Sequence, residues 1–203
     1  MTAEVGEHDV PDPAARSGER TLEPDDGLLA AIADGDGDAF RRLLVNHLDA
    51  IHSYLYRMTG STADAEDLAQ ETFLRVWRKA STFEPGRVKV TTWIHTIAHN
   101  LCIDAFRRNK VTHAEEDVTL ADDTADPERL ASDGQLAALM ERAIAALPGN
   151  QRSAILLCQV QGFSNAQAAR ILGMNVRALE SQLARARRTL RQALTAGTGG
   201  GER

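Results

Sequence analysis

Aromatic residues are scarce in this chain: its 203 residues include two Trp, two Tyr and five Phe. Alanine and leucine, which favour helices, are abundant instead. No segment alternates polar and apolar residues in the way that a half-buried strand does. These absences predict an all-α protein.

Long hydrophobic runs are also absent, and none approaches the roughly 20 residues that a membrane-spanning helix needs. The N-terminus carries acids and prolines rather than the basic and then apolar segments of a secretion signal. The two cysteines, Cys102 and Cys158, fall on apolar helix faces, which suits a reducing compartment better than a disulfide. We therefore expect a cytoplasmic protein without membrane insertion.

The sequence has no nucleophile elbow, P-loop or dinucleotide fingerprint. Glu66 and Asp67 are adjacent, so their side chains diverge and make a poor catalytic pair. His95 and His99 have a spacing that can bind zinc, but no glutamate directly follows the first and no third ligand lies nearby. We interpret both histidines as facing solvent or DNA, and we expect no enzymatic activity, no cofactor and no metal.

The net charge of −6 is unevenly distributed. Residues 1–26 hold eight acidic and two basic side chains, and residues 111–133 hold eight acidic and one basic. By contrast, residues 84–110 hold five basic and two acidic, and residues 141–195 hold eight basic and two acidic. Because local charge attracts a polyanion more than total charge does, the two basic segments remain compatible with DNA binding.

Apolar periodicity divides the chain into two small helical domains. Residues 1–26 lack it and are expected to form a disordered acidic tail. The first helical domain is expected over 27–110, and a flexible acidic linker over 111–134. The second helical domain follows over 135–195, and residues 196–203 form a second disordered tail. Within the first domain, the inward stripes of two expected helices include Leu48 and Trp77.

The second domain is expected to end in a helix-turn-helix. Ser164 is a suitable N-cap for its first helix, Gly173 suits the turn, and Asn175 caps the second helix. A basic second helix is what major-groove binding needs, although an ordinary helix pair with a solvated basic face would have the same pattern. The arginines of that helix are Arg177, Arg185, Arg187, Arg188 and Arg191.

Three segments in order resemble a bacterial RNA polymerase sigma factor of the extracytoplasmic-function (ECF) type. They are DAEDLAQETFLRVWRK at 64–79, TTWIHTIAHNLCIDAFRR at 91–108, and the segment that starts ALPGNQRSAILL at 146–191. The resemblance covers residues 28–110 and 135–194. It implies one helix that docks on the β′ clamp of the polymerase, one that melts and reads the minus-ten element, and a module that reads the minus-thirty-five element.

The resemblance also implies site residues. The resemblance assigns clamp binding to the outer face of residues 64–79, where polar side chains surround one apolar side chain. The resemblance assigns minus-ten binding to a pocket-forming loop at 83–90 and to the helix after it. In this loop, Val90 stands where relatives often carry an aromatic residue. The clamp residues are Asp64, Asp67, Gln70, Glu71, Leu74 and Arg75, and the minus-ten residues are Arg87, Lys89, Asn100, Arg107 and Arg108.

On the recognition helix, the residues expected to face the minus-thirty-five element are Arg177, Glu180, Ser181, Arg185 and Arg188. Glu180 and Gln182 stand where many relatives have basic residues. Glutamate can accept from cytosine N4 and glutamine can pair with adenine, so the promoter specificity is expected to differ.

The expected function is that of a sigma factor, which directs promoter-specific initiation, as in an alternative or stress-response regulon. Its expected partners are RNA polymerase core, through the β′ clamp and β flap, promoter DNA and an anti-sigma factor. The alternative is a stand-alone helix-turn-helix transcription regulator, in which residues 28–110 sense an effector. Purification with polymerase core separates the two.

Overall fold

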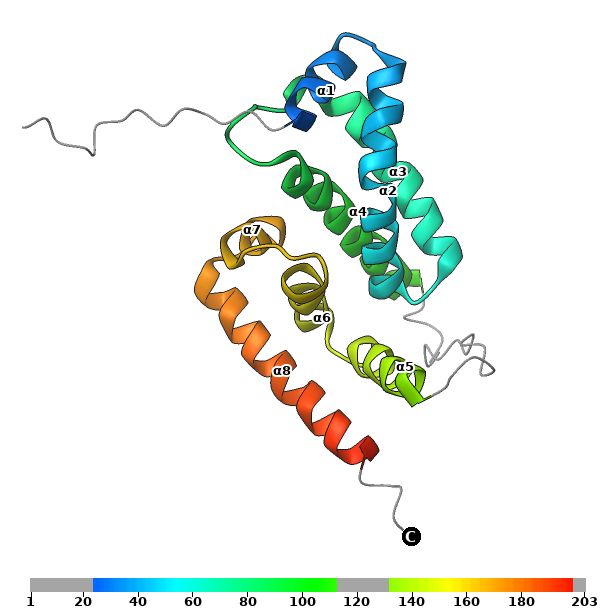
Figure 1. Cartoon of the computed structure of the whole chain (residues 1–203), viewed down its shortest axis with the longest axis vertical. Helices are drawn as coiled ribbons and strands as arrows, with labels where there is room; N and C mark the ends of the chain where they lie inside the picture. Colours follow the sequence, from blue (N-terminus) through cyan, green and yellow to red (C-terminus); the bar gives the residue numbers. More distant parts are fainter. Residues whose placement is uncertain (1–23, 113–131, 199–203) are drawn as a thin grey trace, which may run out of the picture.

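The computed structural model describes residues 24–112 and 132–198, which fold into helices without any strand (Figure 1). The all-α prediction is thereby confirmed. The first module contains α1 (Pro24–Ala33), α2 (Gly37–Thr59), α3 (Thr62–Lys79), a 3-10 turn η2 (Ala80–Thr82) and α4 (Val90–Thr112). The second module contains α5 (Ser132–Ala145), α6 (Gly149–Ile155), a π-helical turn η3 (Leu156–Val160), α7 (Asn165–Ile171) and α8 (Val176–Thr198).

Helix α1 begins earlier than the sequence pattern indicated. Residues 24–26, expected to belong to the acidic tail, are its first turn. A proline is well suited to the first helical position, and Asp25 and Asp26 interact favourably with the positive end of the helix. Asp25 also accepts from Asn46 at 3.2 Å and lies 2.7 Å from Nε2 of His47, which ties α1 to α2.

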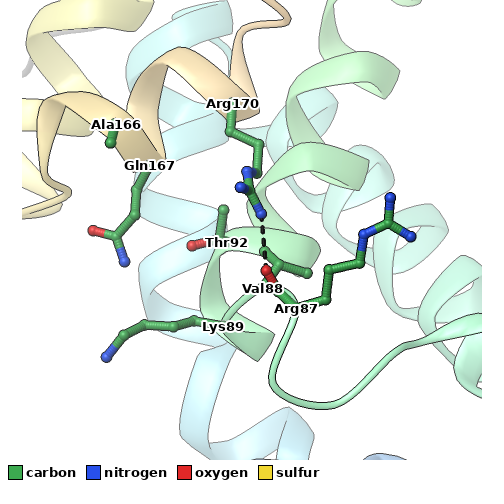
Figure 2. Close-up of a pocket in the computed structure, with 7 residues that line it drawn as sticks. All are labelled: Arg87, Val88, Lys89, Thr92, Ala166, Gln167 and Arg170. Carbon is green, nitrogen blue, oxygen red and sulfur yellow. Dashed lines mark hydrogen bonds between the residues drawn. The ribbon is translucent and has the colours of Figure 1, made fainter. Parts of the chain in front are cut away.

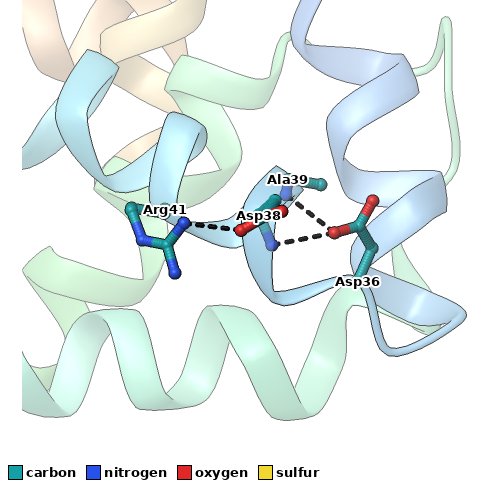
Figure 3. Close-up of polar contacts among 4 residues, drawn as sticks. All are labelled: Asp36, Asp38, Ala39 and Arg41. Atoms are coloured by element: carbon teal, nitrogen blue, oxygen red, sulfur yellow. Dashed lines mark hydrogen bonds and ion pairs between the residues drawn. The ribbon is translucent and has the colours of Figure 1, made fainter.

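Helix α2 has a defined start and end. Figure 3 shows Oδ1 of Asp36 accepting from the backbone N–H groups of Asp38 at 2.8 Å and Ala39 at 3.0 Å. Asp38 in turn forms an ion pair with Arg41 at 2.5 Å. The helix ends at Gly60, whose φ of 75° lies in the left-handed region. These local signals set the length of α2, which has 23 residues.

Two apolar residues expected in the core are exposed. Leu48 of α2 and Trp77 of α3 are each 38% exposed, and Trp77 packs edge-on against Phe40 at 5.2 Å between ring centroids. Periodicity identifies the apolar face of a helix but not the width that its neighbours cover. The surface between α2 and α3 is therefore less covered than the pattern suggested.

The ends of the expected linker are helical. Helix α4 extends to Thr112 and α5 begins at Ser132, so each enters the range 111–134. Likewise, α8 extends to Thr198, into the expected C-terminal tail. The rest of the linker and the two tails, at 113–131, 1–23 and 199–203, lie outside the described residues.

The helix-turn-helix follows its sequence signals. Ser164 and Gln167 form a reciprocal capping box at the start of α7. Gly173 has a φ of 62°, and Oδ1 of Asn175 accepts from the N–H of Ala178 at 2.8 Å. These capping predictions are confirmed. The apolar face of α8 is buried through Leu179, Leu183, Ala186 and Leu190.

The two modules pack against each other. Helix α4 lies beside α7, and α2 lies beside α5, α6 and η3 (Figure 1). The π-helical turn ends at Gln161, from which Nε2 donates to the backbone carbonyl of Ala50 in α2 at 3.1 Å. The residue directly after η3 therefore bonds to the first module.

Candidate nucleic-acid and protein interfaces

The predicted minus-thirty-five residues lie on the exposed side of α8. Its buried side packs inside the second module, so these side chains have no helix above them in the described structure. At 100° per residue, the buried and exposed sets occupy different faces of one amphipathic helix. The exposed residues are Arg177, Glu180, Ser181, Arg185 and Arg188.

The predicted minus-ten residues form an extended row rather than one pocket. Arg87 and Lys89 are exposed in the loop before α4, and Asn100 and Arg107, seven residues apart, share one face of the helix. Arg108 is exposed beside them. Arg87 pairs with Glu84 at 2.7 Å and Arg107 with Asp104 at 3.7 Å, both on the exposed surface. Salt would screen such pairs, and DNA phosphates could replace the carboxylates.

The interpretation of His95 and His99 as surface histidines is wrong. They are 3% and 7% exposed, because α4 packs between α2 and α3 of the first module and α7 of the second. The ring of His95 packs edge-on against Phe163, with 4.7 Å between centroids, and Nδ1 of His99 lies 2.8 Å from the hydroxyl of Tyr54. Burial lowers the pKa of each histidine to about 4. Both are therefore neutral at pH 7.

The described residues around the two histidines do not form a group of metal ligands. Within residues 24–112 and 132–198, no three or more His, Cys, Asp or Glu side chains gather closely enough to hold a metal ion. Cys102 lies one turn beyond His99 and is also buried, which raises the pKa of its thiol to about 12. A thiol that stays protonated is a poor metal ligand and a poor nucleophile.

A groove of about 440 Å³ runs between α2 and α3. Leu44, Leu48 and Phe73 supply its apolar surface, and Asp49 and Gln70 are among the polar residues at its edge. Of the six predicted clamp residues, Gln70 alone is part of this groove. No residue of α2 was predicted to line this groove, because the apolar periodicity of α2 placed Leu48 in the core.

The other predicted clamp residues lie elsewhere on α3. Asp64, Asp67 and Leu74 are exposed, and Leu74 is the large apolar residue among them. Glu71 and Arg75 are half-buried and paired at 2.7 Å, one helical turn apart. Each charge is therefore partly neutralised by the other, so each would contribute less to binding a partner protein than an unpaired charge would.

Three side chains of the second module donate to backbone carbonyls of the first. Besides the Gln161 bond, Nη1 of Arg152 donates to Met58 at 2.7 Å and Nη1 of Arg170 to Arg87 at 3.0 Å. Arg152 also donates to Leu147 at 3.2 Å and to Ala145. Met58 lies in the last turn of α2, where carbonyls have no partner within the helix. Arg152 thus joins the ends of two helices from different modules.

Two family models match the chain, and they fall on its two modules. Sigma-70 region 2 matches residues 43–112, and Sigma-70, region 4 matches residues 137–190. A protein with these two regions, the second ending in a helix-turn-helix, is a sigma factor of the sigma-70 class.

Similar proteins of known family show which type of sigma factor this chain is. The chain is 38% identical over 186 residues to the ECF RNA polymerase sigma factor SigM of Mycobacterium tuberculosis, covering 90% of each chain. It is 33% identical over 184 residues to SigE of Mycolicibacterium smegmatis, covering 85% of this chain and 70% of that one. The chain belongs to the family of ECF RNA polymerase sigma factors. It directs transcription initiation with RNA polymerase at promoter DNA, and a stand-alone regulator is not favoured.

Solved structures show the same fold. The chain superposes on the sigma factor RpoE of Bartonella quintana, solved in complex with the anti-sigma factor NepR, with a TM-score of 0.67 and 28% identity. That match covers 77% of this chain and 96% of the other. CnrH, solved with the cytosolic domain of CnrY, gives a TM-score of 0.66 and 27% identity over 86% of this chain and 99% of the other. No helix in the described ranges is long and apolar enough to cross a membrane.

Proposed function

We propose that three separate surfaces of this sigma factor bind the polymerase clamp, the minus-ten element and the minus-thirty-five element. The first domain, 27–110, binds the polymerase clamp and the minus-ten element. The second domain, 135–195, binds the minus-thirty-five element and the β flap. Residues 111–134 form the linker, whose acidic side chains resemble nucleic acid in charge and suit the basic RNA exit path of the polymerase.

The observation that carries this proposal is the division of α8 into two faces. Its leucines are buried inside the module, and Arg177, Ser181, Arg185 and Arg188 are all exposed. Arginine and serine donate to base edges and phosphates in the major groove. Glu180, exposed on the same helix, repels phosphate but can accept from cytosine N4, which would favour a promoter containing cytosine at that position.

The clamp contact is supported by the groove between α2 and α3 together with the outer face of α3. An apolar surface edged by polar side chains is typical of a protein–protein contact. We assign the centre of the contact to Leu48 and Leu74, which are 38% and 48% exposed. Asp64, Asp67 and Gln70 would supply the surrounding polar contacts, and Glu71 and Arg75 one paired position.

Melting of the minus-ten element is assigned to the loop at 83–90 and to α4. Asn100 would contact a captured base, and Arg87, Lys89, Arg107 and Arg108 would bind phosphates. The free energy for strand separation comes from these contacts and from the polymerase. The chain itself hydrolyses no nucleotide, and it acts as a non-enzymatic factor with polymerase in the cytoplasm.

We further propose that the packed arrangement of the two modules is inactive. The two promoter elements lie roughly 25 base pairs apart, or about 85 Å at 3.4 Å per base pair. Helices α4 and α7 are in contact, so α4 and α8 cannot span that distance together. Binding of the whole promoter therefore requires the modules to separate. An anti-sigma factor, such as the partners in the solved neighbours, would prevent engagement until a signal releases it.

Run-off transcription with purified core polymerase tests the proposal, on the promoter upstream of the gene for this chain. We expect discrete initiation that depends on the protein. Arg185→Ala should weaken promoter use and leave binding to core unchanged. Gln70→Ala should weaken binding to core and leave binding of the isolated minus-thirty-five duplex unchanged. Equal loss of both activities in either variant would contradict the division into separate surfaces.

A further inference from the structure

A cavity of about 210 Å³ opens between the two modules, at the loop that precedes α4 (Figure 2). Arg87, Lys89 and Thr92 line it from the first module, and Gln167 and Arg170 line it from α7. It therefore exists only while the modules are packed together. The groups that line it are donors and cations, and no carboxylate is among the described residues at its wall.

The hydroxyl of Thr92 has no protein partner there. The residue is 1% exposed, and its Oγ1 is buried without a hydrogen bond to any described residue. An unsatisfied buried hydroxyl is costly, which singles out this position. Figure 2 shows the hydroxyl turned into the cavity toward Gln167. The oxygen of the Gln167 amide already accepts from the N–H of Ser164 at 3.0 Å, so its nitrogen is left to donate.

Cations complete the set of donors. The guanidinium of Arg170 donates one N–H to the carbonyl of Arg87 at 3.0 Å, and its other N–H groups can donate elsewhere. Lys89 lines the same cavity, and Figure 2 shows its extended side chain directed away from Arg170, on the same side of Thr92 as Gln167. The amino end of the 23-residue helix α4 adds the positive end of a helix dipole.

We propose that this cavity binds a phosphate group, either free or on a small phosphorylated molecule, and that the bound group holds the two modules together. A tetrahedral anion with acceptor oxygens on every side matches a hydroxyl, an amide nitrogen, an ammonium and a guanidinium. The ligand would bind the packed arrangement and not the separated one, so it would shift the protein toward the packed arrangement by mass action.

The effect of phosphate binding on promoter binding rests on the proposed function. Lys89 is also assigned to the backbone of the minus-ten element, so a phosphorylated ligand and promoter DNA would compete for this cation. The site itself does not depend on that assignment, because binding of phosphate can be measured without polymerase or promoter.

The test is a titration of the full chain, labelled with ¹⁵N, with inorganic phosphate at constant pH and ionic strength. We expect saturable shifts of the backbone amides of Thr92, Gln167 and Arg170. Thr92→Val, which removes only the hydroxyl, should weaken phosphate binding about tenfold, as expected for loss of one hydrogen bond to a charged group. Arg142→Gln removes an exposed cation of α5 and should bind phosphate as the unaltered chain does.

Shifts that grow linearly with phosphate, or equal affinity in Thr92→Val and the unaltered chain, would overturn the proposal. A single-stranded oligonucleotide distinguishes the source of the phosphate. A small ligand is indicated if the oligonucleotide leaves the amides of Gln167 and Arg170 unshifted. If it shifts them saturably and Thr92→Val weakens it about tenfold as well, the site serves the DNA backbone and the proposal fails. Run-off transcription separately decides the proposed function.

Discussion

The ring of Phe163 packs edge-on against the imidazole of His95, with 4.7 Å between centroids and 73° between planes. Phe163 belongs to the second module and His95 to α4 of the first, and both are buried. A helix assigned to promoter DNA thus has one face covered by the other promoter-binding module. Because this contact stabilises the packed arrangement, it also decides how often the covered face of α4 is exposed for binding.

Phe163→Ala should favour separation of the modules. Loss of a buried phenyl ring costs about 3 kcal/mol or more, which corresponds to roughly a hundredfold in an equilibrium constant. Small-angle scattering should show a larger radius of gyration for this variant. Phe40→Ala is the control, because Phe40 packs on Trp77 within the first module. It should lower the melting temperature without changing the radius of gyration of the folded protein, and equal expansion in both variants would contradict the prediction.

Acid should also separate the modules. Burial lowers the pKa of His95, which packs against Phe163 of the second module, to about 4, against about 6.5 when exposed. The packed arrangement therefore has its full stability above pH 6.5 and loses it as the pH falls from 6.5 toward 4. His95 contributes up to about tenfold per pH unit to the ratio of separated to packed protein. Scattering measured across this range checks the expansion.

His95 can be separated from other titrating groups by substitution. His95→Gln should flatten the pH dependence, because the side chain that packs against Phe163 no longer takes up a proton on exposure. His52→Gln is the matched control, since His52 lies in the groove between α2 and α3, away from the second module. If the two variants expand over the same pH range as the unaltered chain, His95 is not responsible.

Arg152→Met should destabilise the protein through unpaired carbonyls. The aliphatic stem is kept, but the carbonyls of Met58 and Leu147 lose their donor. Unsatisfied buried carbonyls cost about 2 kcal/mol, or about 4–8 °C in melting temperature for a chain of this size. Arg142→Met, at an exposed position of α5, should change the melting temperature by less than about 2 °C. Calorimetry compares the two variants.

Leu48→Lys should weaken binding to core polymerase. Leu48 lies in the groove between α2 and α3, and a lysine there would place a charge where an apolar contact is proposed. Val45→Lys provides the comparison, because Val45 is 75% exposed on the same helix and does not line the groove. Affinity for core, measured by fluorescence anisotropy, should fall at least about tenfold for the first and little for the second. Similar affinities would remove the groove from the interface.

Arg188→Ala should change the salt dependence of DNA binding. If Arg188 contacts one phosphate, its loss should reduce the slope of log K against log salt by about 0.9. Binding of the second module's promoter element by the full chain, measured over a range of salt concentrations, gives this slope. Arg142→Ala should leave it unchanged. An unaltered slope for Arg188→Ala would mean that the side chain is only a solvated part of the exposed face.

Local sequence determined the helices, and their ends where a capping residue stands. Ser164, Gly173 and Asn175 set the helix-turn-helix because each acts on backbone groups within three or four residues, so neighbours in sequence suffice. The apolar periodicity of α8 likewise determined which of its faces is buried. Motif order along the chain was enough to indicate the family. The assignments of individual DNA and clamp contacts stay predictions.

Only the tertiary structure decided what covers each face. His95 and His99 look like surface residues in the sequence, but His95 is buried against Phe163 of the second module and His99 against Tyr54 of α2. Leu48 looks like a core residue and lines an open groove instead. Burial depends on elements that are distant in sequence, and no local pattern states which of them will meet. The sequence therefore determines the helices and the chemistry that each presents, whereas the packing of the two modules decides which of those surfaces are available.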